Sequence, residues 1–219
     1  MPIRISLEKA LTKIKEKIYR MFDITQESIW LSIQYLFEGK EDLLQKIKEN
    51  EEKSDILNLD IQEECMSVLI RQQPVAKDAR FVVAVMEISS FFERINDLSV
   101  EISELQPAKF NAELIKIRDY IMWMIQRIDH MIEVVEESLR TERINKIDKK
   151  LTEFDDDIDE LFMKAHQILI DYLKSEKSKV EDAVKLLYVI RHLERIGDIV
   201  AKTGSRIIYI EKGKRVLIK

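Results

Sequence analysis

The sequence predicts an all-α protein of two tandem antiparallel three-helix bundles with six long helices, and three observations lead to that prediction. Its 219 residues include only four Gly and three Pro, which leaves little of the turn chemistry that a β fold needs. Apolar side chains recur three or four positions apart in a chain rich in Glu, Lys, Leu and Ile, which is the spacing of amphipathic helices. The segment Glu93–Asp97 (Glu-Arg-Ile-Asn-Asp) returns as Glu194–Asp198 (Glu-Arg-Ile-Gly-Asp), 101 positions later, which indicates a tandem repeat of about 100 residues.

The first repeat reads as three helices with clear breaks between them. The first helix, approximately residues 6–38, ends at Gly39, a residue that tolerates the left-handed backbone common after a helix. The second helix, approximately residues 41–71, stops before Pro74, because proline has no backbone N–H and its ring collides with the preceding turn. The third helix follows this proline and ends at Leu105, shortly before the next proline.

The second repeat follows the same plan. The apolar pattern resumes at Leu114 and runs to about Leu139, which predicts the fourth helix. The fifth helix covers about residues 143–174, and the polar run Lys174–Ser178 makes the next turn. The sixth covers about residues 180–210. We therefore expect the repeats, each a three-helix bundle with short connections, at residues 1–106 and 107–219.

Composition excludes several classes of protein. The formal net charge of −5 argues against a nucleic-acid partner, because nucleic-acid binders usually present a basic face. No apolar run reaches the roughly 18 residues of a transmembrane helix, so direct membrane insertion is not expected. The N-terminus shows no signal-peptide pattern, and the single Cys65 excludes an internal disulfide, as suits a reducing compartment. These features predict a cytoplasmic protein.

The residues of the common catalytic sites are missing from the sequence. It contains no Gly-rich phosphate loop and no Ser-His-Asp or Cys-His arrangement. The three histidines, His130, His166 and His192, are scattered, and none has a Glu three positions before it, as di-iron helical bundles require. Each is expected to be a surface or boundary side chain, and we expect no enzyme activity.

Pairs of carboxylates one helical turn apart are the chemical feature that recurs. Six Glu or Asp residues have an Asp four positions later, where composition alone predicts about three, so the spacing by itself is weak evidence. Four of the pairs, however, occupy matched places in the two repeats, at offsets of 104 and 101 residues: Glu51/Asp55 with Asp155/Asp159, and Glu93/Asp97 with Glu194/Asp198.

The four matched pairs are predicted to lie outside the hydrophobic core. At 100° per residue, one apolar stripe forms on each of four helices. The stripe of the second helix is Leu43, Ile47, Ile61 and Val68, and that of the third is Phe81, Val85, Ile88, Phe92, Ile95 and Ile102. The stripe of the fifth helix is Ile147, Ile158, Leu161 and Ala165, and that of the sixth is Leu186, Val189, Leu193, Ile196 and Val200. The carboxylates lie to one side of these stripes. If the two helices of each repeat are neighbours, four carboxylates converge at its surface and suit a hard cation such as Mg, Mn, Ca or iron, and less often Zn.

Alternatives remain within this pattern. The run Glu153–Asp157 offers overlapping pairs, so Asp156 competes with Asp155 as a ligand. Arg94 and Arg195 recur beside the glutamates, where a surface ion pair of little energetic value is as plausible as a functional role. A charged, solvated helix face remains the simplest interpretation of any single pair.

With one further motif, these residues resemble the PhoU family. Residues Arg71–Arg80 (Arg-Gln-Gln-Pro-Val-Ala-Lys-Asp-Ala-Arg) match that family's junction between the second and third helices, and the two Glu-Arg-Ile-x-Asp segments match the third helix of each of its repeats. The resemblance extends over nearly the whole chain. It implies two similar three-helix bundles with multinuclear iron or zinc clusters, held here by Glu51, Asp55, Glu93 and Asp97 and by Asp155, Asp159, Glu194 and Asp198.

The resemblance also implies a function. Members of the family are cytosolic regulators of phosphate uptake that repress the phosphate-starvation response when phosphate is ample. Their partners are the ATPase subunit of the phosphate ABC transporter and a sensor histidine kinase, and a homodimer is compatible with this role. Three hypotheses follow: a metal-binding regulator, which we favour; a helical scaffold or adaptor without functional metal; and a carboxylate-bridged metal enzyme, which the missing imidazole ligands and general base disfavour.

Overall fold

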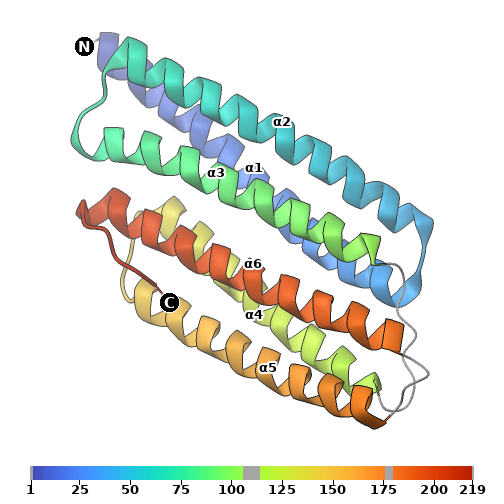
Figure 1. The fold of residues 1–219 in the computed structure, drawn as a ribbon. Coiled ribbons are helices and arrows are strands. Elements are labelled where there is room, and N and C mark those ends of the chain that lie inside the picture. Colours follow the sequence, from blue (N-terminus) through green and yellow to red (C-terminus); the bar gives the residue numbers. More distant parts are fainter. Residues whose placement is uncertain (1, 106–113, 176–179, 219) are drawn as a thin grey trace.

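A computed structural model describes residues 2–105, 114–175 and 180–218 and confirms the all-α prediction (Figure 1). Six helices account for nearly all of these residues: α1 Pro2–Glu38, α2 Glu41–Gln72, α3 Ala76–Glu104, α4 Ile115–Thr141, α5 Ile147–Ser175 and α6 Val180–Lys212. In the described ranges, no helix is both long and apolar enough to span a bilayer. The expected repeat boundary at residues 106 and 107, the break at Pro107 and most of the turn Lys174–Ser178 lie outside the described residues.

The helices form two three-helix bundles that lie side by side. α1, α2 and α3 pack on one another, and so do α4, α5 and α6. Between the bundles, α3 packs along α6 and α1 contacts α4. Figure 1 shows α2, α3, α6 and α5 in that order across one layer, with α1 and α4 behind it and with α3 and α6 running in opposite directions. The middle of the layer is therefore a contact between matched helices of the two repeats.

The hydrophobic core runs through both bundles as one cluster. At its centre in the first bundle, the rings of Phe22 and Phe92 lie with centroids 4.3 Å apart. The predicted apolar stripes are buried with one exception, because Leu161 is only partly buried. The period of the apolar residues thus identified the inward face of every helix that it was applied to.

Two helix starts differ from their predictions by about four residues, and the first is that of α1, which begins at Pro2 rather than near residue 6. α5 begins at Ile147 rather than near residue 143, because the chain turns between Glu142 and Lys146. Both of these residues adopt the left-handed conformation, with φ of 58° and 60°. Neither residue is glycine, so the local sequence does not predict this turn.

The junction motif connects the first repeat to the second. Lys77 forms ion pairs with Glu142 at 2.6 Å and Glu211 at 2.8 Å, which lie at the ends of α4 and α6. Arg80 Nε donates a hydrogen bond to the carbonyl of Ile210 at 3.0 Å, in the last turn of α6. The cations at the start of α3 therefore hold the C-terminal ends of two helices of the other repeat, where carbonyl groups lack partners within the helix.

Replacing Arg80 by alanine is expected to lower the free energy of unfolding by about 1–2 kcal/mol, because a charge-assisted hydrogen bond between the repeats is lost. Arg71, at the other end of the motif, is exposed and forms no ion pair or hydrogen bond within the described ranges, so Arg71→Ala is the matched control and should change stability by less than about 0.5 kcal/mol. Urea unfolding followed by circular dichroism measures both. Equal effects of the two substitutions would contradict the proposed connection.

Candidate metal centre

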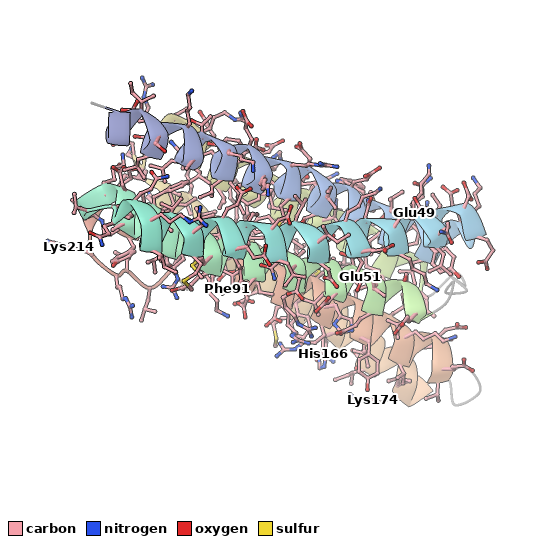
Figure 2. All side chains as sticks on the ribbon, turned by 90° about the horizontal axis from the view of Figure 1, so that it is seen from above. Glu49, Glu51, Phe91, His166, Lys174 and Lys214 are labelled. Carbon is pink, nitrogen blue, oxygen red and sulfur yellow. The ribbon has the colours of Figure 1, made fainter. Side chains whose placement is uncertain are left out.

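The carboxylates of the first repeat converge where α2 packs on α3. One oxygen from each of Glu51, Asp55 and Asp97 lies within 4.8 Å of the other two. Glu51 lies part-way along α2 (Figure 2). Asp97 reaches it from the C-terminal third of α3. Glu93, one turn before Asp97, is half-buried beside the group. The expectation that the two helices are neighbours and bring their pairs together is thus correct for this repeat.

Burial and mutual repulsion make this arrangement unfavourable for charged carboxylates. Loss of solvent raises the pKa of Glu51, and the charges of Asp55 and Asp97 raise it further. The pKa of Asp55 rises through burial and then through Asp97. The pKa of Glu93 rises through burial and then through Asp97 and Asp55. A bound cation would remove this repulsion, because it turns each repelling oxygen into a ligand.

The recurring arginine of the first repeat lies at the edge of this group. Arg94 pairs with Asp97 and with Glu101, each at 3.0 Å, on its own helix. Its copy in the second repeat, Arg195, makes no ion pair that we find in the described segments. Arg94 therefore forms the kind of partly exposed ion pair that contributes little to stability. Arg195 does not, so the two arginines are not equivalent.

The second repeat builds its set differently, because one carboxylate is buried. Asp155 is only 7% exposed, although it was expected outside the core with the other pairs. Burial raises its pKa to about 6, with further contributions from Asp198 and Asp159. The pKa of Asp159 is raised by burial and then by Asp198. Asp156 lies close enough to raise the pKa of both, so it remains an alternative ligand.

The difference between Asn96 and Gly197 explains this burial. A Cβ atom at Gly197 would stand 2.9 Å from Ile158 Cδ1 and 3.9 Å from Asp155 Oδ1, so its absence lets α5 lie close against α6. In the first repeat, Asn96 fills the matching space. Its buried amide donates to Thr25 at 2.7 Å and Ser54 at 3.0 Å. At the variable position of the repeated segment, the second repeat thus has Ile158 and Asp155 close against a glycine, where the first repeat has a buried, hydrogen-bonded amide.

Cations of the second repeat already approach its carboxylates. Arg191 donates to Glu194 Oε1 at 2.7 Å, and Lys202 lies 3.9 Å from Asp198. Glu194 Oε2, however, is buried without a hydrogen-bond partner. Within the described parts of the chain, no three carboxylates of this repeat come as close together as those of the first. Sequence reasoning missed Arg191, although its place three residues before Glu194 is a helical pairing distance.

Both sets fit a hard metal ion by the chemistry of their donors. All eight predicted ligands offer carboxylate oxygens, and the unpartnered Glu194 Oε2 is a buried acceptor that a cation would satisfy. In the first set, three carboxylate oxygens also lie close enough together to bind one ion. In the second, Arg191 already occupies Glu194 Oε1, so Oε2 is the oxygen of this residue that is open to a metal. Whether metal binds at either set is a prediction that the geometry supports and does not test.

The remaining candidate groups do not form a catalytic site in the described residues. Burial raises the pKa of the Cys65 thiol to about 12, which makes it unreactive. His192 is half-buried 3.6 Å from Glu101, and burial lowers its pKa. His130 is exposed beside Glu133. A cavity of about 320 Å³ between α5 and α6 is lined by Phe162, His166, Val184, Leu187, Tyr188 and Arg191, and by none of the predicted ligands.

Comparison with known proteins identifies the repeat. A model of the PhoU domain matches residues 18–106 and again residues 121–207. The chain is 32% identical over 212 residues to the phosphate-specific transport system accessory protein PhoU homolog of Archaeoglobus fulgidus, covering 97% of this chain and 98% of that one. It is 28% identical over 219 residues to PhoU homolog 1 of Thermotoga maritima, covering 97% and 91%.

Solved structures have the same fold. The crystal structure of PhoU from Pseudomonas aeruginosa superposes with a TM-score of 0.82 at 18% identity, covering 94% of this chain and 99% of the other. The crystal structure of the phosphate transport system regulatory protein PhoU from Streptococcus pneumoniae superposes with a TM-score of 0.83 at 19% identity, covering 96% of this chain and 99% of the other. At these identities the likeness establishes the two-bundle architecture.

Proposed function

Because the chain belongs to the PhoU family, we propose that it is a metal-binding accessory protein of phosphate uptake that represses the phosphate-starvation response. It acts in the cytoplasm, on the ATPase subunit of a phosphate ABC transporter and on a sensor histidine kinase. It is a regulator and not an enzyme. The names of its relatives, which are accessory proteins of the phosphate-specific transport system, support the first part of this proposal.

The observation that carries the proposal is the convergence of carboxylates between two helices of one repeat. Glu51 and Asp55 come from α2 and Asp97 from α3, with oxygens within 4.8 Å. Side chains that repel one another at such a distance weaken the contact between their helices unless a cation joins them. Metal occupancy would therefore draw α2 and α3 together and set the surface that this repeat presents to a partner.

The donor set restricts the ion. Carboxylate-only ligation suits iron, Mg or Mn, and zinc in clusters, and the family resemblance favours iron or zinc. Four carboxylates in each repeat carry more negative charge than one divalent ion balances, which is compatible with the multinuclear clusters that the family resemblance implies.

The test compares metal binding by the wild type and two variants. Calorimetric titration and elemental analysis are expected to show iron or zinc bound to the wild type, and at least about tenfold weaker binding to Asp97→Asn/Asp198→Asn, which loses one ligand from each set. Asp42→Asn is the control. It changes an exposed acidic residue that also belongs to an i,i+4 pair, with Glu38, and should leave binding unchanged. Equal and negligible binding by all three proteins would refute the metal part of the proposal.

A helical scaffold without functional metal is the alternative, and one observation favours it for the second repeat. Arg191 and Lys202 already lie beside Glu194 and Asp198, so part of the carboxylate charge there is balanced without a metal. The scaffold is the better description if a chelator changes neither the melting temperature nor the affinity for the transporter ATPase.

A further inference from the structure

The outer side of α2 exposes a row of large apolar side chains. Ile56, Leu59, Met66 and Ile70 are 54%, 65%, 48% and 68% exposed, and we call these four residues the α2 stripe. Their spacings of three, seven and four place them on one face of the helix. α2 lies at the edge of the layer, and within the described residues it packs only on α1 and α3 (Figure 1). Its opposite face supplies Leu57, Ile61, Cys65 and Val68 to the core.

The fold does not need apolar side chains at these four places. At the offset of 104 residues that aligns the carboxylate pairs, the matching positions of α5 are Glu160, Met163, Ile170 and Lys174. Two of the four are charged there, although α5, with 29 residues against the 32 of α2, also packs on two helices of its own repeat. The stripe is therefore a feature of the first repeat alone, and folding of the bundle does not account for it.

Acidic residues continue and interrupt the stripe. Glu52 stands four residues before Ile56, and Glu63 lies between Leu59 and Met66 on the same face. Both are exposed and form no ion pair within the described ranges. Asp55, one of the predicted ligands, flanks the stripe on one side, whereas Lys53 lies on the other. Together, Glu52, Glu63 and the α2 stripe thus form one solvent-facing line. It contains two unpaired negative charges and no positive charge.

This charge pattern disfavours a second copy of the chain as the occupant. Glu63 is the midpoint between Ile56 and Ile70. A two-fold axis parallel to the helices pairs Glu63 with Glu63, and so does a perpendicular axis through the middle of this face, because such an interface is self-complementary. Two like charges would then be desolvated against each other between apolar side chains. A partner with a cation at that point avoids the conflict.

We propose that the α2 stripe is a docking surface for an amphipathic helix of a partner protein, with apolar side chains three and four positions apart and Lys or Arg opposite Glu52 and Glu63. An apolar face binds such a helix by burying its anchors, and complementary charge sets its register. The surface lies beside Asp55, so the helix would pack next to the first carboxylate set. The inference rests on the proposed function only in that a regulator needs a protein partner, and it does not require a metal.

The test transfers the residues of the second repeat to the first. The variant Ile56→Glu/Ile70→Lys places in α2 the side chains that α5 has at the matching positions, with no change in net charge. Its control, Met163→Glu, removes an exposed apolar side chain of α5, 62% exposed. The probe is a fluorescent synthetic helix of about 20 residues with Leu at three- and four-residue spacing and Lys on its flanks. A second peptide replaces every Lys by Glu.

The wild type and Met163→Glu are expected to bind the basic peptide, with an affinity that falls as the salt concentration rises. The double variant is expected to bind this peptide at least about tenfold more weakly than the wild type. Equal binding of the basic and acidic peptides, or undiminished binding by the double variant, would overturn the proposal. So would sedimentation data showing that the wild type dimerises and the double variant does not, because the face would then belong to a second copy.

Purified transporter ATPase and the cytoplasmic part of the sensor kinase separate this inference from the proposed function. If the wild type binds either protein and the double variant binds it equally well, the docking surface is wrong and the proposed function stands. If the wild type binds neither protein and still prefers the basic peptide, the proposed partners are wrong and the surface stands.

Discussion

Truncation of Phe92 to alanine is expected to lower the free energy of unfolding by about 4 kcal/mol, because it leaves a large cavity in the first bundle. The side chain is fully buried, and its ring packs against Phe22 at a centroid distance of 4.3 Å. Phe92 belongs to the core cluster that runs through both repeats, so the loss should appear as one cooperative transition at lower denaturant concentration. Guanidinium unfolding followed by circular dichroism measures it.

Phe91→Ala is the matched control, since it removes the same side chain one position away. Phe91 is only partly buried, and Arg206 lies over its ring at 5.9 Å. Its truncation should cost less than about 2 kcal/mol, because solvent or neighbouring side chains can fill the space. A loss for Phe92 no larger than that for Phe91 would mean that the α1–α3 contact is looser than described.

The pH dependence of stability should depend strongly on Asp155. Its pKa is about 6 in the folded chain, against an ordinary value of 3.8 for an unfolded chain. Between these two values the folded state binds more protons than the unfolded state, so stability falls as pH rises from about 4 to 6 and is flat above. A difference of about two pKa units corresponds to roughly 3 kcal/mol. Below pH 4 the carboxyl is neutral in both states and the loss is absent.

The experiment compares the wild type with Asp155→Asn across that pH range, in the presence of a chelator. The amide cannot ionise, so the variant should lack most of the decline and be more stable than the wild type at neutral pH. Asp159→Asn, at an exposed position of the same helix, should retain most of the decline, because burial and not the charge of Asp159 is the largest cause of the raised pKa of Asp155. If the proposed metal binding is correct, iron or zinc without chelator should stabilise the wild type at neutral pH. Parallel pH profiles for wild type and Asp155→Asn would contradict the assignment.

Much of the fold followed from local chemistry. Apolar residues at helical spacing identified the buried faces, and Gly39 and Pro74 marked two of the breaks. The turn before α5 was misplaced by about four residues, because Glu142 and Lys146 adopt left-handed backbone without a glycine to signal it. The matched positions of the carboxylate pairs in the two repeats were equally informative, since they marked the two helices of each bundle whose carboxylates converge if the helices are neighbours.

The details of the two carboxylate sets did not follow from the sequence. Asp155 and Glu51 occupy comparable sequence positions, yet only Asp155 is fully buried. The cause is the space left by Gly197, and its effect depends on how closely α5 lies against α6. The three-residue spacing of Arg191 and Glu194 could have predicted their ion pair. Whether this ion pair competes with a metal depends on the positions of the other carboxylates.

By itself, the sequence determined the helical class, the duplication, the inward faces of the second, third, fifth and sixth helices and the residue types of the candidate metal centre. These are local or periodic properties, and a helix of 3.6 residues per turn converts them directly into faces. Only the tertiary structure decided which oxygens come within reach of one ion, which carboxylate loses its solvent, and that Lys77 and Arg80 hold the other repeat. Those outcomes depend on distances between helices, which are set by side chains far apart in the chain.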